Sequence, residues 1–188
     1  MKITLIVIAV LVLMLLFMGA KFVGVRNDLA TQQEAVKRQW SDVEGVLQRR
    51  ADLIPNLVAT VQGFAKHETE VYKDIADARS ALINGRTPQD KIAANDQLSG
   101  ALSRLLVVAE NYPQLKSNEN FLRLQDELSG TENRIFVERR KYNDALQTYN
   151  TNLQLFPNNI VASLSGFTRN DAYFHTEPGA EKAPKVQF

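Results

Sequence analysis

A long apolar stretch at the amino terminus constrains this chain more than any other feature of its sequence. Residues 3–20 contain a single polar side chain, and the stretch continues to Val25 beyond Lys21. A membrane-spanning helix needs about 20 apolar residues, and the aliphatic stem of a flanking lysine can carry its charge to the interface. We therefore predict that residues 1–25 form a transmembrane anchor, which contacts the lipid bilayer through residues 3–25.

A cleaved signal peptide is the alternative interpretation of the same stretch. The apolar run is longer than the core of about 7 to 15 residues that signal peptides use. Met18 also stands where a cleavage site before residue 21 would need a small side chain. The sequence therefore favours an uncleaved anchor.

Basic residues flanking the stretch indicate its orientation. Lys2 precedes it, whereas four basic residues follow within about 20 positions, and Lys and Arg accumulate on the cytoplasmic side. These four are Lys21, Arg26, Lys37 and Arg38. We expect a single-pass protein with its amino terminus outside and its soluble part leaning to the cytoplasm.

The composition excludes several classes of function. With 22 Lys and Arg against 21 Asp and Glu, the net charge is +1, so the chain lacks the basic excess that nucleic-acid binding requires. It has no cysteine and two histidines, which excludes disulfides, thiolate metal sites and cysteine nucleophiles. No phosphate-binding loop, nucleophile elbow or His-Glu-x-x-His motif occurs. We expect a protein that is not an enzyme, with no catalytic residue, no cofactor and no nucleic-acid partner.

The rest of the chain shows helical periodicity and no strand-like alternation. Apolar residues spaced three and four apart predict helices over residues 36–54, 55–82, 88–112 and 118–156. Pro55 is expected to end the first of these, which is otherwise free to continue from the membrane, although a kinked continuous helix is the alternative. We predict an all-α fold: the anchor, an antiparallel four-helix bundle over residues 26–167, and an irregular tail over residues 168–188.

The last long helix carries an uninterrupted heptad series. Its members are Phe121, Leu128, Ile135, Tyr142, Tyr149 and Phe156. A helix of this length needs partners along its whole length, and these are either the other helices of the same chain or a second copy.

Four charged residues fall on positions predicted to face the interior: Arg50, Glu68, Glu132 and Arg139. Because an unpaired buried charge costs several kcal/mol, we expect them to form a structural network of buried ion pairs. Counting helical residues from one end puts Glu68 and Glu132 at a similar height, so a carboxylate metal site with His67 is the less favoured alternative. We predict no metal site.

Several motifs resemble those of the LemA family. They are Trp40, the segment Arg49-Arg50-Ala51-Asp52-Leu53-Ile54-Pro55-Asn56-Leu57-Val58, the segment Tyr112-Pro113-Gln114-Leu115-Lys116, the series from Phe121 through Thr131-Glu132, Arg139 and Tyr142-Asn143 to Tyr149-Asn150, and the closing Pro184-Lys185-Val186-Gln187-Phe188. The likeness covers nearly the whole chain. It implies a single-pass protein of a bacterial inner membrane with a helical bundle inside, and it implies no enzymatic activity.

Three functions remain open from the sequence. The first is an interaction or scaffolding module that recruits other membrane or envelope proteins, with Val186 and Phe188 in the tail as a candidate partner-binding end. The second is a self-assembling structural membrane protein, a homo-oligomer that uses the heptad series. The third is the carboxylate metal-binding bundle.

Overall fold

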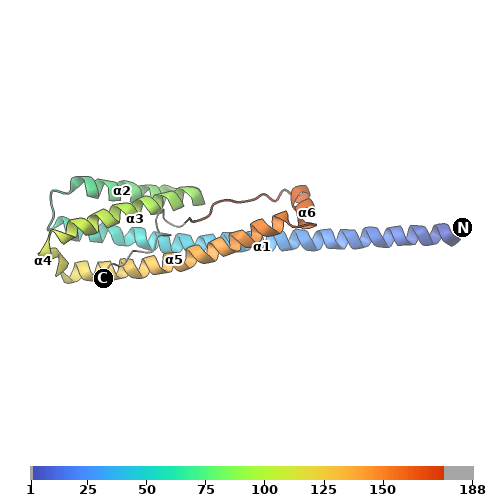
Figure 1. Ribbon diagram of the computed structural model, residues 1–188, viewed down its shortest axis with the longest axis horizontal. Helices are drawn as coiled ribbons and strands as arrows, with labels where there is room; N and C mark the ends of the chain where they lie inside the picture. Colours follow the sequence, from blue (N-terminus) through green and yellow to red (C-terminus); the bar gives the residue numbers. More distant parts are fainter. Residues whose placement is uncertain (1, 176–188) are drawn as a thin grey trace, which may run out of the picture. The chain divides into compact units, whose positions relative to one another are not determined.

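The computed structural model describes residues 2–175, and within this range it contains helices and no strand. The helices are α1 (Lys2–Gln62), α2 (Thr69–Asn84), α3 (Pro88–Glu110), α4 (Pro113–Lys116), α5 (Glu119–Gln154) and α6 (Asn158–Ser165). Figure 1 labels them along the chain. The predicted all-helical fold with an apolar amino-terminal helix is confirmed at this level.

The chain divides into two compact units, which cut across α1 and α5. Within the described residues, unit 1 comprises 2–41 and 141–171, and unit 2 comprises 42–140 and 172–175. The division differs from the single helical domain expected over residues 26–167. It arises because α1 and α5 are long enough to pack against different neighbours at their two ends.

The apolar start of α1 has the properties of a membrane span. Its most apolar window is 18 residues long with a mean hydropathy of 3.0, and none of that window is buried. The buried core helix of a soluble protein is therefore not the explanation for this composition. By length and composition, α1 is a candidate transmembrane helix.

Pro55 does not end the first helix, contrary to the sequence prediction. It lies inside α1, which continues to Gln62. A proline in a helix removes the amide that would bond the carbonyl four residues earlier, and here that carbonyl belongs to Ala51. The guanidinium Nε of Arg79, in α2, donates a hydrogen bond to the Ala51 oxygen at 2.7 Å, so the buried carbonyl is satisfied from the neighbouring helix.

The break falls instead at Gly63–Glu68, between α1 and α2. The seam predicted to run through residues 55–82 is thus divided between two helices. Tyr72 stabilises the turn, since its hydroxyl donates to the Ala65 carbonyl at 2.6 Å.

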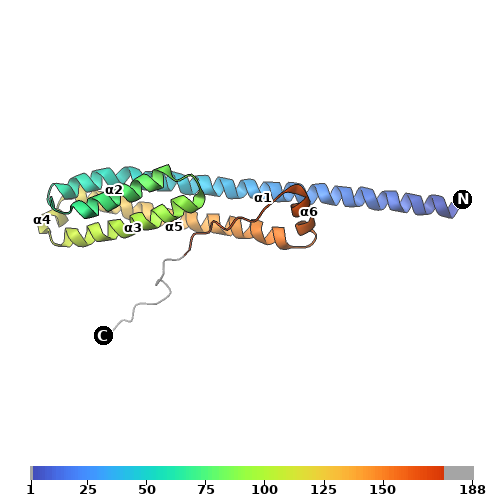
Figure 2. The ribbon, with the colours of Figure 1, turned by 90° about the horizontal axis from the view of Figure 1, so that it is seen from above.

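Unit 2 is built on the helices α2 and α3 and on the parts of α1 and α5 that lie beside them (Figures 1 and 2). Its α3 begins as the sequence predicts. Thr87 accepts a hydrogen bond from the Asp90 amide, and the Asp90 carboxylate accepts one from the Thr87 amide, which completes a capping box ahead of Pro88.

Unit 1 contains the apolar span, the end of α5 and α6. The Trp40 and Tyr142 rings pack with centroids 5.2 Å apart, and Asn152 donates to the Gln32 side chain at 2.7 Å. Gly166 ends α6 with a φ of 76°, a left-handed conformation that glycine adopts without strain. The segment after it is held to α5 by Asn150, which donates to the Asn170 carbonyl at 2.6 Å and accepts from the Asn170 amide at 3.1 Å.

Candidate functional site

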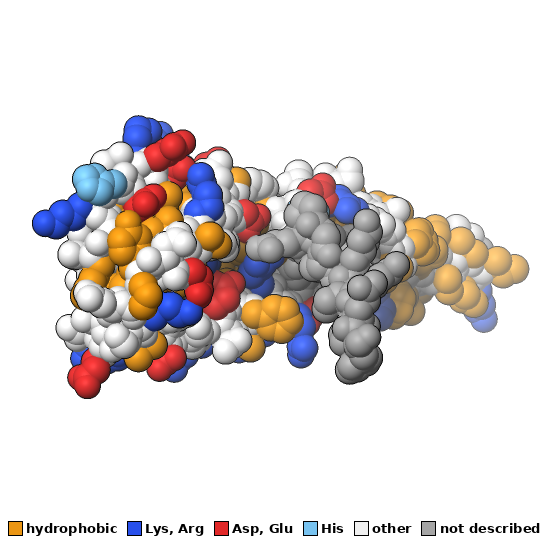
Figure 3. Space-filling view, turned by 60° about the vertical axis from the view of Figure 1, so that its left-hand side comes forward, with side chains coloured by type: hydrophobic (Ala, Val, Ile, Leu, Met, Phe, Trp, Pro, Cys, Tyr) orange, Lys and Arg blue, Asp and Glu red, His pale blue; other side chains and the backbone are white. Residues whose placement is uncertain are grey.

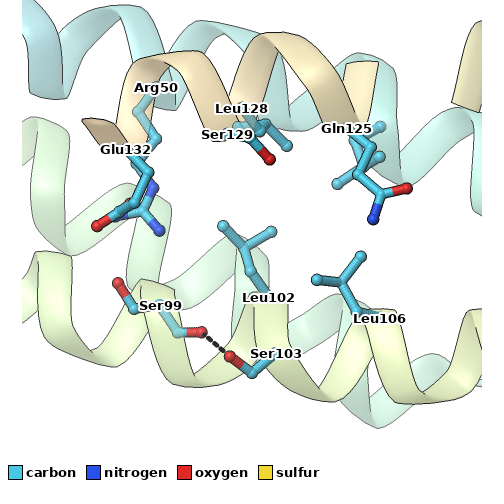
Figure 4. Close-up of a pocket in the computed structure, with 10 residues that line it drawn as sticks. Arg50, Ser99, Leu102, Ser103, Leu106, Gln125, Leu128, Ser129 and Glu132 are labelled. Carbon is cyan, nitrogen blue, oxygen red and sulfur yellow. Dashed lines mark hydrogen bonds and ion pairs between the residues drawn. The ribbon is translucent and has the colours of Figure 1, made fainter. Parts of the chain in front are cut away.

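A groove in unit 2 is the best candidate for a binding site. It has a volume of about 290 Å³ and is lined from α1, α3 and α5 (Figure 4). Four leucines supply its apolar lining: Leu57, Leu102, Leu106 and Leu128. Hydroxyl and amide side chains of Ser99, Ser103, Gln125 and Ser129 lie beside them. Such a lining suits aliphatic side chains of a ligand that also offers polar groups.

Arg50 and Glu132 lie at one end of this groove. The Arg50 guanidinium lies 3.0 Å from a Glu132 carboxylate oxygen and also donates to the Asn95 side-chain oxygen at 2.8 Å. The Arg50 side chain is 7% exposed and that of Glu132 is 48% exposed, so the pair joins a buried cation to a carboxylate at the surface. Its position makes Glu132 the charged group that an incoming ligand would meet.

The structure separates the other two members of the predicted network. Glu68 precedes the first residue of α2 and is half-buried. Since α1 continues for 12 residues from Arg50 to Gln62 before this turn, Glu68 lies about 18 Å further along the helix axis. Glu68 and Glu132 do not share a layer, because the break after Gln62 shifts α2 away from the register that Pro55 suggested.

Arg139 contacts the carboxyl-terminal segment instead of the other charges. Its guanidinium donates to the His175 carbonyl at 2.8 Å and lies 4.6 Å from the centre of the Phe174 ring, a cation–π geometry. Phe174 is 5% exposed and Ala172 is 2% exposed. The aromatic residues of the tail therefore anchor it, as far as residue 175.

No group of three or more His, Asp or Glu side chains in residues 2–175 could hold a metal ion. His67 is exposed. Together with the separation of Glu68 from Glu132, this removes the geometry on which the metal-binding alternative depended.

Burial perturbs two tyrosines. Desolvation raises the pKa of Tyr72 above its usual value, with smaller contributions from the nearby Glu68 carboxylate and from Tyr112. Burial alone raises the pKa of Tyr149, whose hydroxyl donates to the Thr168 carbonyl at 3.1 Å. Both hydroxyls bond backbone carbonyls, so they serve the packing of the helices and not acid–base chemistry.

Two polar residues that matter here were not singled out by the sequence. Asn95 is fully buried and joins Arg50, and Arg79 completes the helix at Pro55. Asn95 lies beside the seam residue Ala94, where a buried amide is an available signal. No signal at Arg79 itself indicates its partner, because that partner is a backbone carbonyl made available by a proline 24 positions earlier.

Charged side chains of both signs are interspersed on the face of the molecule shown in Figure 3, with apolar side chains between them. Apolar residues that reach the surface of unit 2 include Leu106, Val107, Leu122, Phe136 and Val137. The surface of this unit thus offers small apolar patches in a charged setting. The predicted partner-binding residues Val186 and Phe188 lie outside the described residues.

Comparison with known proteins gives consistent matches. Residues 39–188 match the LemA family. The chain is 27% identical over 181 residues to "Magnetosome protein MamQ 2" of Paramagnetospirillum magneticum and 24% identical over 181 residues to "Magnetosome protein MamQ" of Magnetospirillum gryphiswaldense. These matches cover 82% of this chain and 66% of each relative, so the chain spans just under two thirds of their length.

A further match is "Protein LemA" of Metamycoplasma hominis. It is 27% identical over 145 residues, with 75% of this chain and 65% of the relative covered.

Proposed function

Because the chain belongs to the LemA family, we propose that it is a membrane-anchored helical protein that serves as an interaction or scaffolding module at a bacterial envelope. One observation carries the proposal. A single uninterrupted helix, α1, begins as an exposed apolar span and ends among the buried side chains of unit 2. No linker separates the candidate anchor from the folded part, so a binding surface on that part stays close to the bilayer.

The proposal includes the finer architecture. In it, unit 2 is an antiparallel four-helix bundle, residues 3–25 cross the bilayer once, and the soluble part lies in the cytoplasm with the amino terminus outside. The charge bias after the span supports this orientation. The partners are other membrane or envelope proteins.

The groove lined by Leu102, Leu106 and Leu128 is the proposed contact site. Its volume accommodates a few aliphatic side chains, as an amphipathic helix of a partner presents them. The polar side chains beside the leucines offer hydrogen bonds to the edges of such a helix. The carboxylate of Glu132, held by Arg50, would favour a basic residue at that end of the partner.

Self-assembly is the second candidate, and the structure changes where its interface would lie. The heptad residues Phe121, Ile135, Tyr142 and Tyr149 are buried within the chain itself. A homo-oligomer would therefore use the exposed apolar side chains, such as Phe136 at 67% exposed, in place of the heptad series. Light scattering on the detergent-solubilised full chain tests this, since a monomeric mass excludes a stable homo-oligomer.

Site-specific photocrosslinking in intact cells tests the contact site. A photoreactive amino acid replaces Leu106, which lines the groove, and in a matched control it replaces Val107, its neighbour on α3, which does not line it. Both side chains are exposed, at 39% and 67%. We expect a discrete protein adduct from position 106 and none from position 107. Equal crosslinking at the two positions, or none at 106, would contradict the groove as the contact site.

A cysteine added at the carboxyl end tests the orientation, because the chain has no other cysteine. Labelling by an impermeant maleimide only after the inner membrane is permeabilised is expected for a cytoplasmic body. Labelling from outside the inner membrane would place the module on the opposite side and redirect the search for partners.

A further inference from the structure

The helix α6 exposes apolar side chains to solvent. Ile160 is 51% exposed and Leu164 is 73% exposed, and because they are four positions apart they share one face of the helix. Phe156, just before the helix, is 81% exposed. On another face, Val161 and Ala162 are buried in unit 1. An eight-residue helix is thus packed on one side and presents an uncovered apolar face on the other.

The position of this face along α1 indicates what covers it. Two contacts in unit 1 fix the register of α5 on α1: Tyr142 packs on Trp40, and Asn152 bonds Gln32. Residue numbers rise along α5 as they fall along α1, so α5 advances toward the apolar span. Gln32 is seven residues from the span's last residue, Val25, which is about 10 Å along the helix.

Phe156 lies four residues beyond Asn152, about 6 Å nearer the span by the same rise. It is therefore within about 5 Å of the end of the apolar stretch, a distance smaller than the thickness of the headgroup region. Figures 1 and 2 both show α6 beside α1, just beyond the end of α5. Leu29 is 1% exposed, and Phe22 and Val25 are partly covered, in agreement with helical segments packed against this part of α1.

The composition of the segment fits a membrane interface. The sequence of α6 is Asn-Asn-Ile-Val-Ala-Ser-Leu-Ser, without a charged residue. Basic side chains that suit lipid phosphates are exposed nearby in unit 1, on Arg26 and on Arg169, whose side chain is 53% exposed. Helices with an apolar face and neighbouring basic residues lie in the plane of the interface, with that face about 5 to 10 Å deep.

We propose that the face formed by Phe156, Ile160 and Leu164 inserts into the headgroup region of the same bilayer that α1 spans. The occupant of this face is lipid, and α6 serves as a second, interfacial contact beside the transmembrane helix. This inference rests on the proposed anchor, because it takes the position of the bilayer from the apolar span.

Depth-dependent fluorescence quenching tests the proposal on the full chain. Single cysteines replace Ile160 or Leu164 in the cysteine-free sequence, carry an environment-sensitive fluorophore, and are reconstituted in phosphatidylcholine and phosphatidylglycerol vesicles with or without a lipid spin-labelled near the headgroup. Leu16→Cys reports the span. Asp144→Cys is the matched control, since it is exposed on α5 in the same unit but eight residues, about 12 Å, further from the membrane than Asn152. Equal helical circular dichroism in all four chains verifies their folding.

We expect the labels at positions 160 and 164 to shift to shorter emission wavelengths and to lose most of their emission to the spin-labelled lipid, while the label at 144 does neither. Quenching at position 16 without quenching at 160 and 164 would leave the anchor standing and overturn the interfacial helix. A wavelength shift at 160 and 164 without quenching would show protein, not lipid, on this face and would also overturn it. If position 16 is not quenched either by this lipid or by one spin-labelled deep in the acyl chain, the proposed anchor itself fails, and the interfacial helix fails with it.

Discussion

The hydrogen bond from Arg79 to the Ala51 carbonyl makes a quantitative prediction. Pro55 leaves this carbonyl without its helical donor, and Arg79 supplies a replacement at 2.7 Å. Replacing Arg79 by Met keeps much of the side-chain stem but removes the donor. We expect Arg79→Met to destabilise the protein strongly in the natural sequence and weakly when Pro55 is replaced by Ala.

The magnitude follows from the surroundings of the carbonyl. Ala51 is fully buried, so water cannot replace the lost donor. A hydrogen bond from a charged group contributes about 1.5 to 3 kcal/mol, and Arg79 is only partly buried, so we expect about 2 kcal/mol for Arg79→Met. With alanine at position 55, the restored amide donates to the same carbonyl, and the cost of Arg79→Met falls to about 0.5 kcal/mol of lost packing. The coupling free energy is thus about 1.5 kcal/mol.

The measurement is a double-mutant cycle on the full chain in mild detergent. Thermal unfolding of the four chains is followed by circular dichroism, and about 2 kcal/mol corresponds to a shift of roughly 4 to 8 °C in Tm for a protein of this size. Lys73→Met is the control, because Lys73 lies on the same helix and its ion pair with Asp77 is exposed. Equal costs of Arg79→Met with proline and with alanine at position 55 would refute the reasoning, since the bond would then not depend on the missing amide.

Three further predictions concern the polar contacts of the two units. In unit 2, Arg50→Met leaves the buried Asn95 oxygen without this donor and should cost about 1 to 3 kcal/mol, more than Glu132→Gln, which keeps an acceptor; denaturant titration that ranks the two in the opposite order would contradict this. Because burial raises the pKa of Tyr72 and Tyr149 above 10, the stability they contribute is present below pH 10 and is lost as the pH rises further; replacing both by Phe should flatten this alkaline decline, and an unchanged slope of Tm against pH would speak against it. Thr87→Ala removes the cap of α3 and should cost about 1 kcal/mol by the same titration, whereas Thr87→Ser should cost little.

The start and end of several helices could be predicted because their causes are local. Thr87 and Pro88 begin α3 through a cap and a missing amide that need no distant partner. The heptad series on α5 likewise predicted which side chains are buried, and Phe121, Ile135, Tyr142 and Tyr149 are. Phe156 is the exception, since α5 ends at Gln154 and the residue is 81% exposed.

The candidate site was only partly predictable, because its charges are paired across helices. Arg50 and Glu132 meet at 3.0 Å, but Asn95, which the sequence did not single out, completes the contact. Arg139 had the spacing of a buried residue, yet it bonds the segment near His175, 36 positions away. Periodicity says that a charge faces inward. It does not say which partner waits there.

The sequence by itself determined the apolar span, the helical content and the family, since each depends on composition or on spacing within a few turns. Only the tertiary structure decided that α1 continues through Pro55, that the chain divides into two units, and that the face of α6 is left uncovered. The physical reason is the same in each case. A helix end, a buried carbonyl or an apolar face is stable or not according to what packs against it, and that neighbour comes from a distant part of the chain.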